Sequence, residues 1–124
     1  MNRPTVLVVE DEPAILGMAR LILERAGYDV LAAETGPDAL ACYHKAADRV
    51  AAVVLDLNIP DLSGLEVLAA LRKVRPNLRV IVSTGSGCDD FPSGDFPDIP
   101  TAVLSKPYRP ADLANIVSRV LAGG

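Results

Sequence analysis

Short apolar runs, each ending in a polar or charged residue, alternate along the chain with segments that have helical spacing. This alternation is typical of an α/β fold in which the strands form a parallel sheet. Because the crossover after each strand is right-handed, such a sheet is expected to be doubly wound. The strands are expected at residues 5–9, 28–33, 50–56, 79–83 and 101–104.

Helix signals follow most of these runs. Pro13 suits a first helical turn and Gly27 suits a C-terminal stop, so the first helix is expected between them. The second helix is expected over residues 35 to 47, and the last is expected to begin with Pro110 in its first turn.

The third helix carries a start signal of its own. Ser63 and Glu66 have the spacing of a capping box, in which the side chain of the first residue accepts a hydrogen bond from the backbone of the second. The apolar face of this helix is expected to use Leu65, Leu68 and Leu71, with Val67 and Val74 beside them.

One segment breaks the alternation. Residues 85–100 stand where a fourth helix is expected between the last two strands, yet they include three glycines and three prolines. Glycine and proline are the residues that helices tolerate least. The segment is therefore predicted to be irregular, with a fourth helix that is shortened to one turn at most.

Composition excludes several classes of protein. The length of 124 residues fits one domain over residues 1–124, and 50% hydrophobic residues argue against disorder. A net charge of −4 argues against a nucleic-acid surface. Two cysteines and one histidine without metal-ligand spacing argue against zinc. The sequence has no apolar stretch that predicts a membrane span or a signal peptide, so a cytoplasmic location is expected.

Acidic residues follow two of the predicted strands. Glu10 and Asp11 come directly after the first run, and Asp56 ends the third. Ligands of α/β proteins bind where parallel strands end, so these carboxylates are expected at one site. Mg²⁺ would relieve their mutual repulsion. Asp11 and Asp56 are predicted as direct ligands, Asn58 through its backbone carbonyl and Glu10 through a water.

The ends of the other strands add groups that suit phosphoryl transfer. Asp56 is the candidate nucleophile, because carboxylates form aspartyl phosphates. Lys106 is a mobile point charge that can neutralise one phosphoryl oxygen, and Thr84 offers a hydroxyl for another. A bound magnesium ion would let an anionic donor approach an anionic acceptor.

Five motifs in order make the chain resemble the receiver domain of two-component response regulators. The resemblance runs over nearly the whole sequence. The motifs are Val8-Val9-Glu10-Asp11-Glu12-Pro13, Ala26-Gly27-Tyr28, Asp56-Leu57-Asn58-Ile59-Pro60-Asp61-Leu62-Ser63-Gly64, Ser83-Thr84-Gly85 and Ser105-Lys106-Pro107-Tyr108.

The resemblance implies a flavodoxin-like five-stranded parallel sheet of order 2-1-3-4-5 with helices on both faces. It implies that a histidine kinase or phosphotransfer protein passes a phosphoryl group to Asp56. The chain itself is expected to be a single receiver domain without an output domain, and a monomer or weak dimer. Such a domain is a signalling module that promotes only its own phosphorylation and dephosphorylation. The implied roles are magnesium binding for Glu10, Asp11, Asp56 and Asn58, and phosphoryl contacts for Thr84 and Lys106.

One departure from the family pattern is Val103, three positions before Lys106, where the family usually has an aromatic residue that reports phosphorylation. Three other functions are alternatives to the receiver. A small aspartate-nucleophile phosphohydrolase usually needs a second aspartate where this chain has Asn58. A flavodoxin-like nucleotide binder would need a phosphate loop where Glu10 and Asp11 would repel phosphate. A degenerate receiver that only docks partners is the remaining alternative.

Overall fold

The apolar runs of the sequence form the strands of one parallel sheet. The structure, a computed structural model, describes residues 3–57, 59, 63–85 and 102–122. Its five strands pair in the order β2-β1-β3-β4-β5, which confirms the order implied by the resemblance. The strands are β1 (Thr5–Val9), β2 (Asp29–Ala33), β3 (Val50–Asp56), β4 (Arg79–Thr84) and β5 (Ala102–Ser105).

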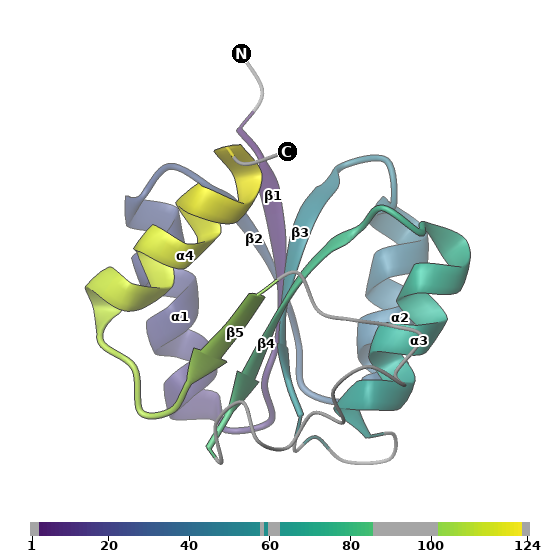
Figure 1. Cartoon of the computed structure of the whole chain (residues 1–124), viewed down its shortest axis with the longest axis horizontal. Helices are drawn as coiled ribbons and strands as arrows, with labels where there is room; N and C mark the ends of the chain where they lie inside the picture. Colours follow the sequence, from purple (N-terminus) through teal and green to yellow (C-terminus); the bar gives the residue numbers. More distant parts are fainter. Residues whose placement is uncertain (1–2, 58, 60–62, 86–101, 123–124) are drawn as a thin grey trace.

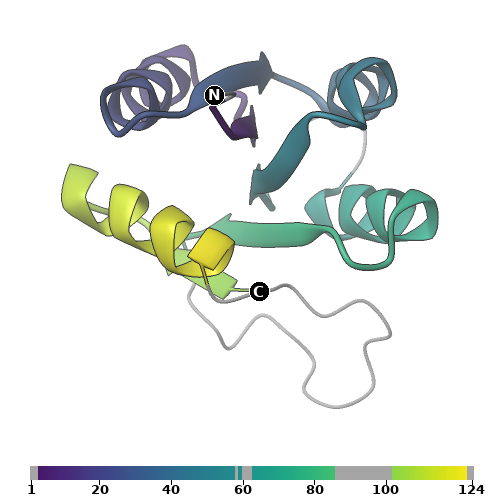
Figure 2. The ribbon, with the colours of Figure 1, turned by 90° about the horizontal axis from the view of Figure 1, so that it is seen from above.

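Helices cover both faces of the sheet, as expected for a doubly wound fold (Figures 1 and 2). Among the described residues they are α1 (Pro13–Arg25), α2 (Gly36–Ala46), α3 (Gly64–Val74) and α4 (Pro110–Ala122). Helices α1 and α4 pack on one face, and α2 and α3 pack on the other. Side chains alternate along each strand, so every central strand contributes to two cores. In β3, Val53 and Leu55 lie in the core under α2 and α3, whereas Val54 lies in the core under α1 and α4.

The predicted helix boundaries match local hydrogen bonds and backbone angles. Gly27 follows Ala26, the C-cap residue of α1, and has a φ of 104°, a conformation that favours glycine. Thr35 Oγ1 accepts a hydrogen bond from the backbone amide of Asp38 at 3.1 Å. Ser63 Oγ accepts one from the amide of Glu66 at 3.2 Å and donates to Glu66 Oε1 at 3.3 Å. The cap at Ser63 is thereby confirmed.

The buried face of α3 differs from the prediction. Val67, Leu68 and Leu71 are buried, but Leu65 is only half-buried and Val74 is exposed. The buried positions follow from Gly64, because residues 64, 67, 68 and 71 have the i, i+3, i+4, i+7 spacing of one helix face. Because glycine has no apolar side chain, the hydrophobic pattern of the sequence does not mark residue 64 as part of this face.

Two expectations lie outside the described residues: the irregular segment between β4 and β5, which falls mostly on residues 86–101, and the position of Asn58. Within the described part of the chain, every helix is too short or too polar to cross a membrane.

The order of the sheet brings the predicted site residues to one edge. In the strand register, Val9 pairs with Leu55, Asp56 pairs with Ser83 and Thr84 pairs with Ser105. The carboxyl ends of β1, β3, β4 and β5 are therefore level with one another. The strand order reverses at β1, where the crossovers leave the sheet in opposite directions, and this is the place where α/β folds bind ligands.

Candidate functional site

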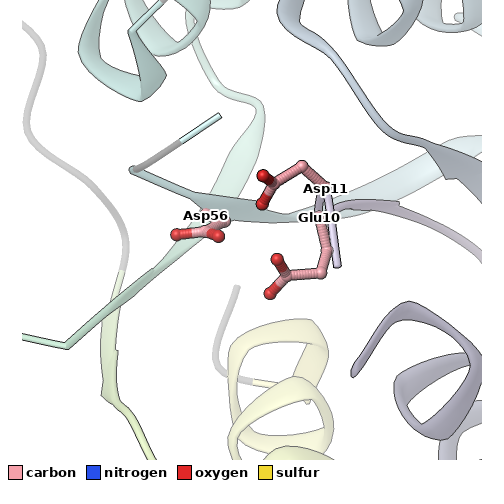
Figure 3. A group of neighbouring side chains, drawn as sticks. All are labelled: Glu10, Asp11 and Asp56. Atoms are coloured by element: carbon pink, nitrogen blue, oxygen red, sulfur yellow. The ribbon is translucent and has the colours of Figure 1, made fainter. Parts of the chain in front are cut away.

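Three carboxylates meet at the carboxyl ends of β1 and β3. One oxygen from each of Glu10, Asp11 and Asp56 lies within 4.8 Å of the others (Figure 3). Glu10 and Asp56 are buried, with only 4% and 3% of their surface exposed, whereas Asp11 is exposed. The sequence prediction that these three residues lie together is thus confirmed.

Lys106 reaches into this cluster from the end of β5. Its Nζ lies 2.7 Å from Glu10 Oε1 and 3.0 Å from Asp56 Oδ2. Its backbone amide donates to the carbonyl of Thr84 at 2.8 Å, which ties the start of the loop after β5 to the end of β4. The Lys106–Pro107 peptide bond is cis. The single ammonium group thus bridges two buried carboxylates that come from different strands.

Glu10 is held at both of its oxygens. Oε1 accepts from Lys106, and Oε2 accepts from the backbone amide of Glu12 at 3.2 Å. Burial raises the pKa of Glu10, and the hydrogen bond from Lys106 only partly offsets that rise. Burial alone would lower the pKa of Lys106, but its hydrogen bonds to Glu10 and Asp56 outweigh this effect and raise it. The positive charge of Lys106 therefore offsets only part of the negative charge of the carboxylates in the cluster.

The donor set fits a hard divalent cation. Carboxylate oxygens are the ligands that Mg²⁺ prefers, and it usually completes its octahedron with waters. Asp11 is exposed and can turn toward an ion from solvent. Both oxygens of Glu10 already have partners, so a contact between Glu10 and an ion through a water requires the least rearrangement.

Two hydroxyl residues end β4 on opposite sides of the sheet. Thr84, the predicted hydroxyl of the site, is buried and is the last residue of the strand. Strand alternation places its side chain on the side of Val82, under α2 and α3. Ser83 pairs with Asp56 in the register and lies on the same side as that residue.

Ser83 is a buried residue of the site for which the sequence alone predicts no role. It is 3% exposed, and its Oγ has no hydrogen-bond partner among the described residues. The signal that could have singled it out is a hydroxyl within an otherwise apolar strand, level with the candidate nucleophile.

An apolar hollow of about 420 Å³ lies beside Lys106. Ile15 and Met18 of α1 line one side, and Pro107 and Tyr108 line the other. Met18 is 37% exposed, and Leu21, one turn further along α1, is 51% exposed. An exposed apolar surface thus adjoins the carboxylate cluster.

Comparison with known proteins agrees with this geometry. The profile of the response regulator receiver domain matches residues 6–118. The chain is 41% identical over 80 residues to the probable transcriptional regulatory protein TcrX of Mycobacterium tuberculosis, covering 64% of this chain and 33% of that protein. It is 35% identical over 118 residues to the sensor kinase CckA of Brucella abortus, covering 94% of this chain and 12% of CckA. The chain therefore spans only a minor part of these two relatives.

Solved structures include close matches to the fold. A response regulator receiver domain protein from Clostridium thermocellum superposes with a TM-score of 0.88 at 28% identity, over 97% of this chain and 95% of that one.

Proposed function

Since the chain belongs to the response regulator receiver domain family, we propose that Asp56 accepts a phosphoryl group from a phosphohistidine of a partner kinase or phosphotransfer protein. The observation that carries this proposal is the surrounding of the Asp56 carboxylate. It is buried, lies beside Glu10 and Asp11, and has the ammonium group of Lys106 at 3.0 Å. Buried acids grouped around one lysine at a sheet edge form an unfavourable arrangement that a bound cation and a phosphoryl group would relieve.

Asp11 and Asp56 would hold Mg²⁺ directly, Glu10 would hold it through a water, and the carbonyl of Asn58 would complete the protein ligands. When bound, the ion supplies charge neutralisation for the phosphoryl oxygens. In the transfer itself, an oxygen of Asp56 forms a bond to phosphorus while the bond between phosphorus and the histidine nitrogen breaks. The histidine leaves with the electron pair of that bond.

Lys106 would act as a mobile counter-charge. In the resting protein its ammonium group is shared by Glu10 and Asp56. As Asp56 becomes an acyl phosphate, the hydrogen bond that Lys106 donates to it would pass to a phosphoryl oxygen, while Glu10 keeps its own hydrogen bond from Lys106. Such charge-assisted hydrogen bonds are about twice as strong as neutral ones, so the new partner compensates for the old.

The phosphoryl group would then shift an equilibrium between two surface states of the domain. Thr84 and Lys106 supply the contacts that differ between the two states. Val103 of β5 is half-buried and cannot make the large swing of an aromatic side chain. The surface change would therefore depend on Thr84 and Lys106. The domain would act in the cytoplasm as a phosphorylation-controlled partner of a downstream protein.

Labelling with radioactive acetyl phosphate in the presence of Mg²⁺ tests the acceptor assignment. Wild type should take up label, and Asp56→Asn should lose it because an amide cannot form the acyl phosphate. Asp48→Asn is the matched control, since Asp48 is exposed and lies before the opposite end of β3. Equal labelling of wild type and Asp56→Asn would overturn the assignment.

A further inference from the structure

Ser83 is a buried hydroxyl on the acceptor side of the sheet. It pairs across the sheet with Asp56 on one side and with Leu104 on the other. Lys106 follows the end of β5, and its Nζ lies 3.0 Å from Asp56 Oδ2, so the ammonium group is on the side of the acceptor. Ser83 thus lies on β4, between β3, which ends in the acceptor, and β5, which the lysine follows.

In the unphosphorylated structure, burial of the Ser83 hydroxyl lowers the stability of the fold. Ser83 Oγ is buried without a hydrogen bond within the described part of the chain, and an unsatisfied buried polar group is destabilising. The paired residue on β5, Leu104, and the residue two before Ser83, Ile81, are apolar. An alanine would satisfy the same packing, so the hydroxyl has no evident structural use in this state.

Lys106 has an N–H donor that can pair with the hydroxyl oxygen of Ser83. An ammonium group has three N–H donors and no acceptor. In the resting protein, two of the carboxylate oxygens of the cluster, on Glu10 and Asp56, accept from it. Under the function proposed above, an oxygen of Asp56 forms a bond to phosphorus. The ammonium group of Lys106 must then reorient toward the phosphoryl oxygens.

We propose that Ser83 is a positioning residue for Lys106, and that its hydroxyl oxygen accepts one N–H of the ammonium group when Lys106 turns to the phosphoryl group on Asp56. The inference rests on the proposed phosphoacceptor function. Ser83 would limit the orientations of Lys106 and so raise the affinity of the site for the phosphoryl group. The hydroxyl that is unsatisfied at rest would thus be satisfied in the phosphorylated protein.

Beryllofluoride with Mg²⁺, as an analogue of the phosphoryl group, gives a direct test. The affinity of wild type for beryllofluoride at saturating Mg²⁺ is compared by titration calorimetry with that of Ser83→Ala. The expected loss is about tenfold, the size of one hydrogen bond to a charged group. Without ligand, in EDTA, the thermal midpoint of Ser83→Ala should equal or exceed that of wild type. Ser105→Ala is the matched control, because Ser105 is an exposed serine at the end of the neighbouring strand.

A double-mutant cycle identifies Lys106 as the group through which Ser83 acts. In a Lys106→Met background, measured at higher beryllofluoride concentration, Ser83→Ala should weaken binding no further. The inference is overturned if Ser83→Ala binds as tightly as wild type, weakens binding equally in both backgrounds, or lowers the midpoint in EDTA. If wild type itself binds no beryllofluoride and takes no label from acetyl phosphate, the proposed function fails and the inference fails with it.

Discussion

At the scale of single residues, Glu10 links the stability of the fold to pH. Burial raises its pKa above the ordinary value of 4.5, so the folded protein holds this proton more tightly than the unfolded chain does. Stability therefore falls as the pH rises from about 4.5 through the raised pKa. Glu10→Gln cannot titrate, and its free energy of unfolding should lack this fall. Urea unfolding in EDTA at several pH values between about 4 and 8, the range in which a buried carboxyl can titrate, measures the difference.

Glu12→Gln is the control for that measurement, because Glu12 is an exposed neighbour on the same loop. Its pH profile should follow wild type. Parallel profiles for wild type and Glu10→Gln would contradict the assignment of the fall to Glu10.

A substitution of Asp11 distinguishes the effect of the carboxylate cluster on stability from its role in binding Mg²⁺. Asp11 adds a third carboxylate to a group in which Glu10 and Asp56 share the ammonium of Lys106, and like charges at this distance repel. Asp11→Asn should therefore raise the thermal midpoint in EDTA by a few degrees and remove most of the gain from Mg²⁺. For wild type, that gain is about 2.7 kcal/mol at a concentration 100 times the dissociation constant. Asp48→Asn should keep the full gain; a full gain in Asp11→Asn would exclude Asp11 as a ligand.

At the scale of secondary-structure elements, the start of α3 is pressed against the end of β3. A Cβ on Gly64 would lie 2.6 Å from Leu57 Cα and 2.8 Å from the Asp56 carbonyl oxygen. Because these are backbone atoms next to the acceptor, Gly64→Ala should cost about 1–3 kcal/mol of stability. It should also slow labelling of Asp56 by acetyl phosphate. Chemical denaturation and the labelling assay measure the two effects.

Gly17, within α1, is the matched control for Gly64. A Cβ there meets no atom within 4 Å, so Gly17→Ala should stabilise the protein by about 0.5–1 kcal/mol through helix propensity alone. A Gly64→Ala variant that is as stable as wild type would show that α3 can move away from β3 without loss.

The elements themselves were predictable because their signals are local. Apolar runs, the cap at Ser63 and the stop at Gly27 depend on residues a few positions apart, and each was found where the pattern placed it. The inner face of α3 was predicted only in part: Val67, Leu68 and Leu71 are buried as expected, whereas Leu65 and Val74 are not, because Gly64 belongs to this face and carries no apolar side chain. Close packing of a helix start on a strand end is a tertiary contact that periodicity does not report.

At the scale of the whole molecule, the site depends on contacts between distant residues. Lys106 and Glu10 are 96 positions apart, yet they form the shortest ion pair among the described residues. The resemblance to receiver domains gave both residues a role, but their direct contact and the unpaired hydroxyl of Ser83 needed coordinates. The register that sets Ser83 level with Asp56 is a property of the assembled sheet, and a slip of one residue would turn Ser83 to the other face.

The whole molecule also determines which phosphoryl donors can reach Asp56. Acetyl phosphate needs only the pocket, whereas a histidine on a protein brings a surface of its own, which we expect to lie against the apolar hollow between α1 and Pro107. Met18→Asp places a charge in the lining of the hollow, and Leu21→Asp places one a turn further along α1; apolar contacts at interface centres tolerate unpaired charge poorly. Both variants should accept label from acetyl phosphate at the wild-type rate. Each should lose about tenfold in rate from a phosphorylated kinase or phosphotransfer protein that labels wild type.

Val74→Asp is the control for these two variants, because Val74 is as exposed as Leu21 but belongs to α3, on the other face of the sheet. It should leave both rates unchanged. If Met18→Asp and Leu21→Asp lose both rates together, the charge disturbs the pocket and not the docking of a donor. If both rates stay at the wild-type level, the donor approaches Asp56 over a different surface, because a protein docked on α1 would have to bury the new carboxylate without a partner.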